Sequence, residues 1–246
     1  MGIKRIIMKN AFQIDGYLKF NLLNSSEFHV LKAFTFNWIY SLLNINNSVF
    51  TTKELLISNY HNWPCEILKD HDQIFTAKNR HCLPSEEINK LINNINLDTA
   101  LREAGCQPRT VFWDEGLGWL GLRLIRPRSS DGYPLSKKIW GPAKNVVSVY
   151  VPIVGFEPEQ TIGLVKGSHL KEYPSYLPAN SKFCKDELRV DLTNDTVVIT
   201  RPSLREGEAI IFGPNTLHTE EIKGGAITRL SLEFRVPLSP KNDDAL

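Results

Sequence analysis

A histidine and an arginine stand eleven residues apart in the stretch LHTEEIKGGAITRL, at residues 217–230. The imidazole of His218 can ligate a transition metal, whereas the guanidinium of Arg229 can bind a carboxylate through two parallel hydrogen bonds. Arg229 also opens the β-like run RLSLEFRV, and an arginine on a buried sheet face needs an anion to offset its charge. The pair therefore predicts a site for a metal and an anionic ligand. The alternative interpretation is that Arg229 is an exposed strand residue paired with Glu233 or Glu220.

The chemistry that joins these two groups is that of a mononuclear non-haem iron(II) site. Such a site holds the metal with two imidazoles and one carboxylate on one face, which leaves three positions for a cosubstrate and oxygen. If the cosubstrate is 2-oxoglutarate, its distal carboxylate needs a bidentate cation, and Arg229 fits that role better than a lysine would. Alternate residues of a strand share a face, so the hydroxyl of Ser231 is expected to reach the same carboxylate.

The order of several sequence motifs resembles the phytanoyl-CoA dioxygenase-like branch of the iron(II)/2-oxoglutarate dioxygenases. The resemblance covers about residues 110–236 and rests on Asp131, then VSVYVPIVGF, TIGLVKGSHL with its Gly-Ser-His, GEAIIFGPNTLHTE, and finally the histidine–arginine spacing. It implies that Asp131 and His218 hold iron(II) and that Arg229, with Ser231, holds 2-oxoglutarate. It also implies hydroxylation of an unactivated carbon, with 2-oxoglutarate converted to succinate.

One position departs from the family pattern. The first metal motif of the family is His-x-Asp, and Ser129 stands here at the histidine position before Asp131. Neutral serine is a poor iron(II) ligand, so the loss of an imidazole should weaken binding severely unless another group replaces it. Three alternatives stay open: a third ligand from elsewhere, weak binding with water in the gap, or a site without iron. His169 of the Gly-Ser-His piece is one candidate imidazole, although the resemblance gives it no ligand role.

A basic segment from Arg123 to Lys144 brackets the expected mouth of the site and contains a single acid, Asp131. Such a run is usually a solvated face, but beside a pocket it would attract a phosphorylated, nucleotide-linked or otherwise acidic substrate. Aromatic side chains of the segment could stack on a sugar ring or a base, although aromatic residues in strands more often belong to the core. The candidate substrate residues are Arg126, Arg128, Tyr133, Lys137, Lys138 and Trp140.

The second half of the chain carries the pattern of a β-fold. From about residue 110 it breaks into short β-rich runs separated by Gly, Pro, Asn and Asp turns. The seven runs are TVFWDE, WLGLRLIR, VVSVYVPIV, TIGLVKG, DTVVITR, EAIIFG and RLSLEFRV. They predict a mainly β fold with some α, whose core at about residues 110–237 is a double-stranded β-helix, or jelly roll.

Helical signals occupy the first hundred residues. Helix starts are predicted at Ser25-Ser26-Glu27, at Thr51-Thr52-Lys53-Glu54 with an end near Tyr60, and at Pro84-Ser85-Glu86-Glu87 with a stop at Gly105. Because no polar linker follows, the helical layer at about residues 20–105 should pack on one sheet, and residues 1–246 are predicted to form a single domain. Four histidines in this half have no ligand spacing and are interpreted as structural or surface residues: His29, His61, His71 and His81.

Composition narrows the class of function. The net charge of +2 argues against a dedicated nucleic-acid binder. No long apolar stretch occurs and the N-terminal run Ile6-Ile7-Met8 is too short for a signal peptide, so a cytoplasmic protein that neither binds nor spans a membrane is expected. Four cysteines without a C-x-x-C pair support neither a zinc ribbon nor a disulfide framework.

The sequence thus predicts an iron(II)/2-oxoglutarate-dependent oxygenase that hydroxylates a small metabolite, with the basic segment favouring a phosphorylated or nucleotide-linked sugar. The alternative is a catalytically altered jelly-roll protein that binds a small anionic ligand without oxygenase activity, which Ser129 favours. A metal-dependent sugar isomerase or epimerase ranks last, because the usual multi-histidine cluster is missing.

Overall fold

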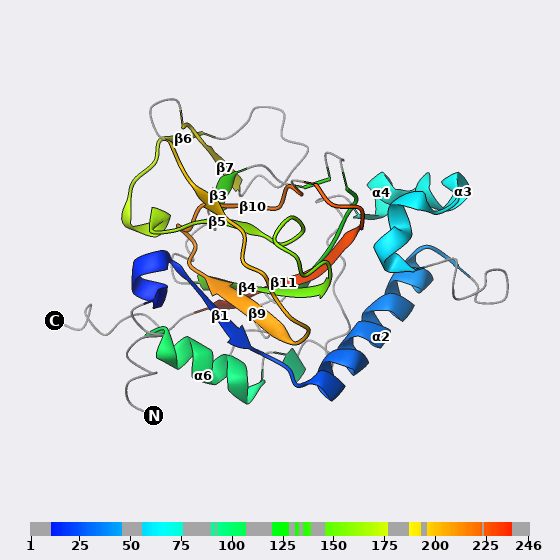
Figure 1. The fold of residues 1–246 in the computed structure, drawn as a ribbon, viewed down its shortest axis with the longest axis horizontal. Coiled ribbons are helices and arrows are strands. Elements are labelled where there is room, and N and C mark those ends of the chain that lie inside the picture. The colour runs from blue at the N-terminus through cyan, green and yellow to red at the C-terminus, as the bar shows by residue number, and fades with distance from the viewer. Residues whose placement is uncertain are drawn as a thin grey trace.

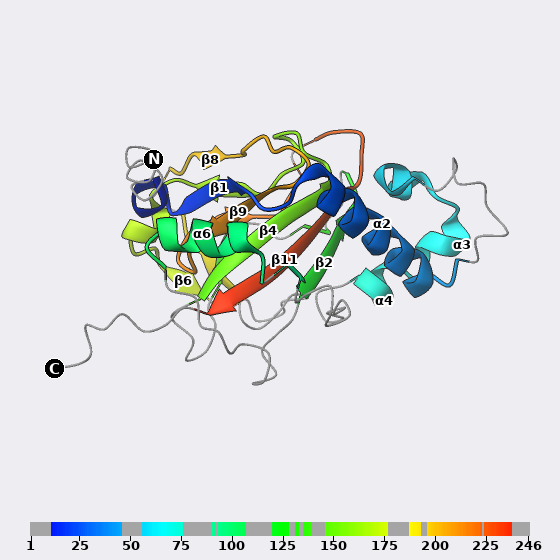
Figure 2. The same cartoon turned by 90° about the horizontal axis from the view of Figure 1, so that it is seen from below.

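The computed structural model describes residues 11–45, 56–75, 90–91, 93–106, 120–127, 131–132, 135–138, 146–176, 187–192, 196–222 and 224–237. Two antiparallel sheets form the centre of the molecule, and helices cover the outer side of one of them (Figures 1 and 2). None of the helices in the described ranges is long and apolar enough to cross a membrane.

The larger sheet has the strand order β1-β9-β4-β11-β2 and the smaller has the order β6-β7-β3-β10-β5-β8. The strands of the larger sheet are β1 (Tyr17–Asn21), β9 (Glu208–Phe212), β4 (Val146–Val154), β11 (Arg229–Pro237) and β2 (Leu120–Ile125). Those of the smaller are β6 (Ser175–Tyr176), β7 (Glu187–Val190), β3 (Ser136–Lys138), β10 (His218–Thr219), β5 (Gly163–Val165) and β8 (Ile199–Thr200). The predicted mainly β, jelly-roll class is confirmed, and the described strands form two facing sheets instead of a closed barrel.

The helical half contains α2 (Ser25–Leu42), a 3-10 helix η1 (Ile57–Asn62), α3 (Cys65–Leu68), α4 (His71–Phe75) and α6 (Ile95–Glu103). The N-cap of α2 is Asn24, one residue before the predicted cap, and it exchanges side-chain and backbone hydrogen bonds with Glu27. The predicted stop at Gly105 is confirmed by its left-handed φ of 79°. The predicted helix starts at residues 51–54 and 84–87 and the run TVFWDE lie outside the described residues.

Strand β11 explains how the fold builds a polar interior. Its even-numbered side chains join the helices in the main apolar core, namely Leu230, Leu232, Phe234 and Val236. Its odd-numbered side chains are equally buried but polar, namely Arg229, Ser231, Glu233 and Arg235. Successive side chains of a strand point to opposite faces, so this polar row faces away from the helices, toward the smaller sheet. The sequence run RLSLEFRV therefore packs one face as core and lines a chamber with the other.

Gly207 shapes the turn that leads into β9. Its φ is +83°, and a Cβ at this position would overlap with the carbonyl oxygen of Leu23. We expect Gly207→Ala to lower the free energy of unfolding by about 2 kcal/mol or more, because an L-residue is strained at this φ and meets fixed backbone. Urea denaturation measures this, with Gly213→Ala as control, since a Cβ there would make only an ordinary 3.5 Å contact with Thr216. Equal destabilisation by the two changes would contradict the prediction.

Candidate active site between the sheets

Arg229 is fully buried, with 0% of its surface exposed, at the start of the polar row of β11. Its Nη1 donates to the carbonyl oxygen of Gln160 over 3.4 Å, and its guanidinium carbon lies 5.9 Å from the ring centroid of Tyr150. Its Nε and Nη2 make no hydrogen bond to any described residue. A buried N–H group without an acceptor costs about 1–3 kcal/mol, so this guanidinium is suited to an anionic ligand.

Further buried polar atoms accompany this guanidinium. The hydroxyls of Ser231 and Tyr150 and the amide oxygen of Gln160 also make no hydrogen bond within the described part of the chain. Burial raises the pKa of Tyr150, and the positive charge of Arg229 and the neighbouring hydroxyl of Ser231 offset only part of that rise, so Tyr150 keeps its proton and can donate it in a hydrogen bond. We call Arg229, Ser231, Tyr150 and Gln160 the arginine pocket. Its excess of donors over acceptors fits a carboxylate.

Two glutamates lie near the arginine pocket. Glu220, 2% exposed, has its Oε2 4.0 Å from Nη2 of Arg229 and 3.6 Å from Nε of Arg123. The same Nε of Arg123 lies 3.8 Å from Oε2 of Glu233. Positive and negative side chains therefore alternate across the interior, from the arginine pocket along β11 and over to β2.

His218 is buried in β10, where it pairs with Ser136 of β3 and Leu164 of β5. Its Nδ1 lies 2.8 Å from the carbonyl oxygen of Thr216. Because a carbonyl oxygen can only accept, Nδ1 carries a proton, and in the neutral ring the lone pair is then on Nε2. This is the arrangement in which proteins orient a metal-binding imidazole through its other nitrogen.

The Gly-Ser-His piece holds the strand of His218 in place. The Oγ of Ser168, in the 3-10 turn η2 (Ser168–Leu170), accepts from the backbone N–H of Leu217 at 2.8 Å and donates to the carbonyl oxygen of Val165 at 2.7 Å. The Nε2 of His169 lies 2.9 Å from the carbonyl oxygen of Gln13, in the N-terminal turn. The described contacts of the motif are thus structural: Ser168 joins β5 to the residue before His218.

Ser168→Ala is expected to lower the free energy of unfolding by about 1–3 kcal/mol, because the buried N–H of Leu217 would lose its acceptor. Chemical denaturation monitored by circular dichroism measures the change. Thr99→Ala is the matched control: it removes an exposed hydroxyl that also bonds a backbone carbonyl, that of Ile95 in α6. A Ser168 variant as stable as the Thr99 variant would refute this role.

Asp131 lies near the end of β10. This follows from the adjacent Gly132, which packs against the backbone of Glu220 and Glu221, the residues that follow β10. Its carboxylate accepts from Arg126 three times, from the backbone N at 3.1 Å, from Nε at 2.7 Å and from Nη2 at 2.8 Å. Burial raises the pKa of Asp131, but the hydrogen bonds from Arg126 and His71 outweigh it and hold the pKa well below its usual range. The carboxylate is therefore charged and engaged by Arg126.

His71 of α4 is the other neighbour of this carboxylate. It is only 3% exposed, and its Nε2 lies 3.4 Å from Oδ2 of Asp131. Its Nδ1 lies 2.9 Å from the hydroxyl of Tyr60, which fixes the ring orientation. The structure thus brings an imidazole of the helical layer to the candidate metal carboxylate. Nevertheless, no three His, Cys, Asp or Glu side chains gather at one position within the described residues.

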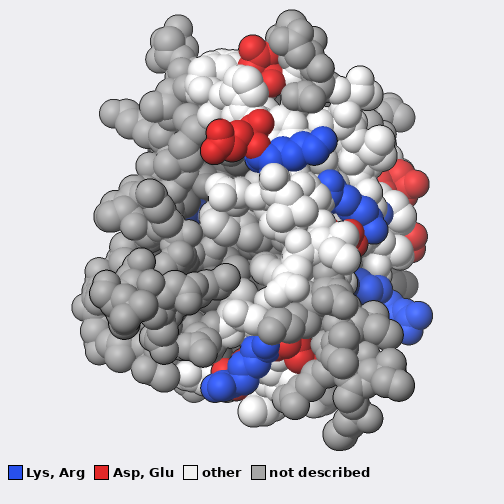
Figure 3. Space-filling model, turned by 90° about the vertical axis from the view of Figure 1, so that its left-hand side faces the viewer, with Lys and Arg blue, Asp and Glu red and all other residues white. Residues whose placement is uncertain are grey.

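The remaining predicted site residues are described only in part. Arg126 is described and pairs with Asp131. Lys137 and Lys138 belong to β3, but their side chains lie outside the description. Ser129, Arg128, Tyr133 and Trp140 lie outside the described residues altogether. On the face seen in Figure 3, the described acidic and basic side chains are interspersed, so this face contributes no extended patch of one charge from its described atoms.

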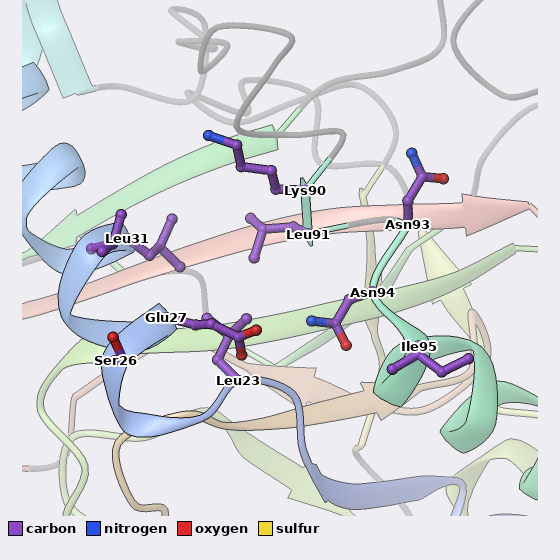
Figure 4. A pocket seen from close by; sticks show the side chains of 10 residues that line it. Leu23, Ser26, Glu27, Leu31, Lys90, Leu91, Asn93, Asn94 and Ile95 are labelled. Carbon is purple, nitrogen blue, oxygen red and sulfur yellow. The ribbon is translucent and has the colours of Figure 1, made fainter.

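A cavity of about 660 Å³ lies elsewhere, between the start of α2 and residues 90–91 and 93–95 (Figure 4). Its walls include Leu23, Leu31, Leu91 and Ile95, with Glu27 at the first turn of α2. It shares no lining residue with the arginine pocket. The buried donors that need an anion therefore belong to the sheet interior and not to this cavity.

Sequence reasoning missed the interior position of several residues. Glu220 was considered only as a partner of Arg229 on an exposed strand, whereas the structure has both side chains buried. Tyr150 was not predicted, because it lies in the mostly apolar run VVSVYVPIV, where an aromatic side chain normally belongs to the core. Gln160 and His71 carry no sequence signal, since their positions depend on how distant segments pack.

The fold is similar to that of several solved proteins, including non-heme, alpha ketoglutarate-dependent enzymes. One is the epimerase SnoN, in complex with Fe3+, alpha ketoglutarate (2-oxoglutarate) and nogalamycin RO: 14% of residues are identical, 96% of this chain and 84% of that chain are covered, and the TM-score is 0.59. AviO1 from Streptomyces viridochromogenes Tue57 is 13% identical over 96% of this chain and 95% of its own, with a TM-score of 0.54. The carbocyclase SnoK is 12% identical over 94% and 83%, with a TM-score of 0.52.

No family model and no curated protein sequence matches the chain. At identities this low, the structural likeness shows the fold alone.

Proposed function

We propose that the protein is an iron(II)/2-oxoglutarate-dependent oxygenase that acts on a small metabolite. The observation that carries this proposal is Arg229, fully buried between the sheets with Nε and Nη2 lacking hydrogen bonds to described residues. The hydroxyls of Ser231 and Tyr150 add two donors beside it. Binding of alpha ketoglutarate by SnoN, on the same fold, supports 2-oxoglutarate as the matching anion.

The arginine pocket would hold the distal carboxylate of 2-oxoglutarate. Arg229 would donate through Nη2 and Nε, and the hydroxyls of Ser231 and Tyr150 would donate to the remaining lone pairs. Apolar side chains of the same interior exclude water and strengthen these bonds, namely Ile162, Leu164, Ile210 and Phe212. The carboxylate would thus fix the orientation of the cosubstrate.

For the metal, the residues fit in part. We propose His218, through Nε2, and Asp131 as ligands of iron(II), which when bound supplies the activation of dioxygen. The contact between Nδ1 of His218 and the carbonyl oxygen of Thr216 supports this role, because it leaves Nε2 to bind the metal. Asp131 would have to exchange at least one of its bonds to Arg126 for the metal. His71 lies 3.4 Å from Asp131, and we propose it as the candidate for the imidazole that is missing at position 129.

The substrate remains a proposal from the sequence. An anionic metabolite, such as a phosphorylated or nucleotide-linked sugar, would contact the basic segment through Arg126, Arg128, Tyr133, Lys137, Lys138 and Trp140. The cytoplasmic location and the phytanoyl-CoA dioxygenase-like branch are likewise proposed from the sequence. Because the shared fold also hosts an epimerase and a carbocyclase, product analysis has to decide between hydroxylation and another oxidation.

The proposal is tested by calorimetric titration of 2-oxoglutarate into protein purified without oxygen and reconstituted with iron(II). We expect saturable binding with one site per chain and, after oxygen is admitted, release of succinate that requires iron. Absence of 2-oxoglutarate binding to the reconstituted protein would overturn the proposal.

The alternative function is a jelly-roll protein that binds a small anionic ligand without oxygenase activity, and two observations favour it. The Asp131 carboxylate is engaged by Arg126 and His71, and the described residues contain no three-ligand cluster. In that case 2-oxoglutarate or another dicarboxylate would bind equally well with and without iron, and no succinate would form. The same titration, repeated on metal-free protein, separates the two functions.

A further inference from the structure

Glu220 is a buried carboxylate placed beside the guanidinium that is proposed to bind the cosubstrate. Its Oε2 lies 4.0 Å from Nη2 of Arg229, and only 2% of the residue is exposed. At 4.0 Å the two groups attract each other strongly in a poorly solvated interior, but the distance is too long for a hydrogen bond. Glu220 therefore offsets the charge of Arg229 without accepting its N–H donors.

A second guanidinium, that of Arg123, also lies near the carboxylate of Glu220. Nε of Arg123 lies 3.6 Å from the same Oε2, closer than Nη2 of Arg229. If a carboxylate ligand bound Arg229, the charge of Glu220 would still be offset by Arg123. The ligand carboxylate would nevertheless approach Glu220 closely, and two like charges in a low-dielectric interior repel each other.

We propose that Glu220 sets the affinity of the arginine pocket by competing with the carboxylate of the incoming ligand for Arg229. This inference rests on the proposed function, in which that ligand is 2-oxoglutarate. In the ligand-free protein Glu220 holds the buried positive charge, and on binding it gives up Arg229 and keeps Arg123. The negative charge of Glu220 thus stabilises the ligand-free pocket and weakens binding of the cosubstrate.

The test compares two neighbouring glutamates by calorimetric titration of 2-oxoglutarate into oxygen-free, iron-reconstituted protein. Glu220→Gln keeps the shape and removes the charge, and we expect its dissociation constant to fall about tenfold relative to the wild type. Glu221→Gln is the matched control, because its side chain is exposed and its contact with Arg201 uses the backbone oxygen. We expect the control to bind as the wild type does, within about twofold.

Each outcome separates this inference from the proposed function. Binding by the wild type with equal or weaker binding by Glu220→Gln would overturn the inference and leave the proposed function standing. No binding by either protein would overturn both. If thermal melting shows that Glu220→Gln is unfolded, Glu220→Asp replaces it: its shorter carboxylate lies farther from Arg229, so tighter binding than in the wild type is again expected and unchanged or weaker binding overturns the inference.

Discussion

Arg229→Ala is expected to weaken binding of 2-oxoglutarate by about a hundredfold or more, because a charge-assisted hydrogen bond contributes about 1.5–3 kcal/mol and two such bonds are lost. The remaining hydroxyls of Ser231 and Tyr150 supply donors but no positive charge. Calorimetric titration of the iron-reconstituted protein without oxygen measures the effect. Thermal melting of the same sample shows whether the variant is folded.

Two further variants define the cause of this loss. Arg229→Lys keeps the charge but loses the planar fork, so we expect affinity between that of the wild type and that of the alanine variant. Arg102→Ala is the surface control and should leave the affinity unchanged, since Asp98, on the exposed side of α6, is the ion-pair partner of Arg102 among the described residues. Binding of 2-oxoglutarate by Arg229→Ala at wild-type affinity would show that the carboxylate binds elsewhere.

His218→Ala is expected to weaken iron(II) binding by about a hundredfold or more, since losing a partner that merely orients a ligand already costs about 10–100-fold. The carbonyl oxygen of Thr216 holds the proton on Nδ1 of His218, so Nε2 is the nitrogen that can bind the metal. Metal content after dialysis and titration with manganese(II), a redox-stable substitute, measure the change without relying on activity. Succinate release should fall in parallel.

His29→Ala is the matched control for this change. His29 lies on the exposed surface of α2, where its Nδ1 is 2.6 Å from the backbone oxygen of Ser25. The control removes an imidazole without touching the sheet interior, so its metal affinity should equal that of the wild type. If His218→Ala retained wild-type metal affinity as well, His218 would not be a metal ligand.

The local pattern of the sequence was enough to predict the polar face of β11. In RLSLEFRV, strict alternation of apolar and polar residues placed Arg229 and Ser231 on one face, and the structure has both fully buried on that face. The β-rich runs likewise predicted the jelly-roll class. These predictions succeeded because strand periodicity and turn residues act over a few neighbouring positions.

The surroundings of Asp131 could not be predicted in this way. Its Arg126 partner is local, but His71 comes from α4, far away in the chain, and meets Asp131 only because α4 packs against β2. His71 has no spacing relative to His218 that marks a shared site, and it was interpreted as structural or surface. The cap of α2 shifted from Ser25 to Asn24 because Asn24 is placed to bond both ways with Glu27.

Crystals of the iron-reconstituted protein, soaked with 2-oxoglutarate in the absence of oxygen, test most directly whether the arginine pocket binds the distal carboxylate of 2-oxoglutarate. We expect density for the distal carboxylate between the sheets, with its oxygens about 2.7–3.2 Å from Nη2 of Arg229 and from the hydroxyl of Ser231 or Tyr150. An arginine pocket that stays without ligand while 2-oxoglutarate binds at another place in the molecule would contradict this expectation.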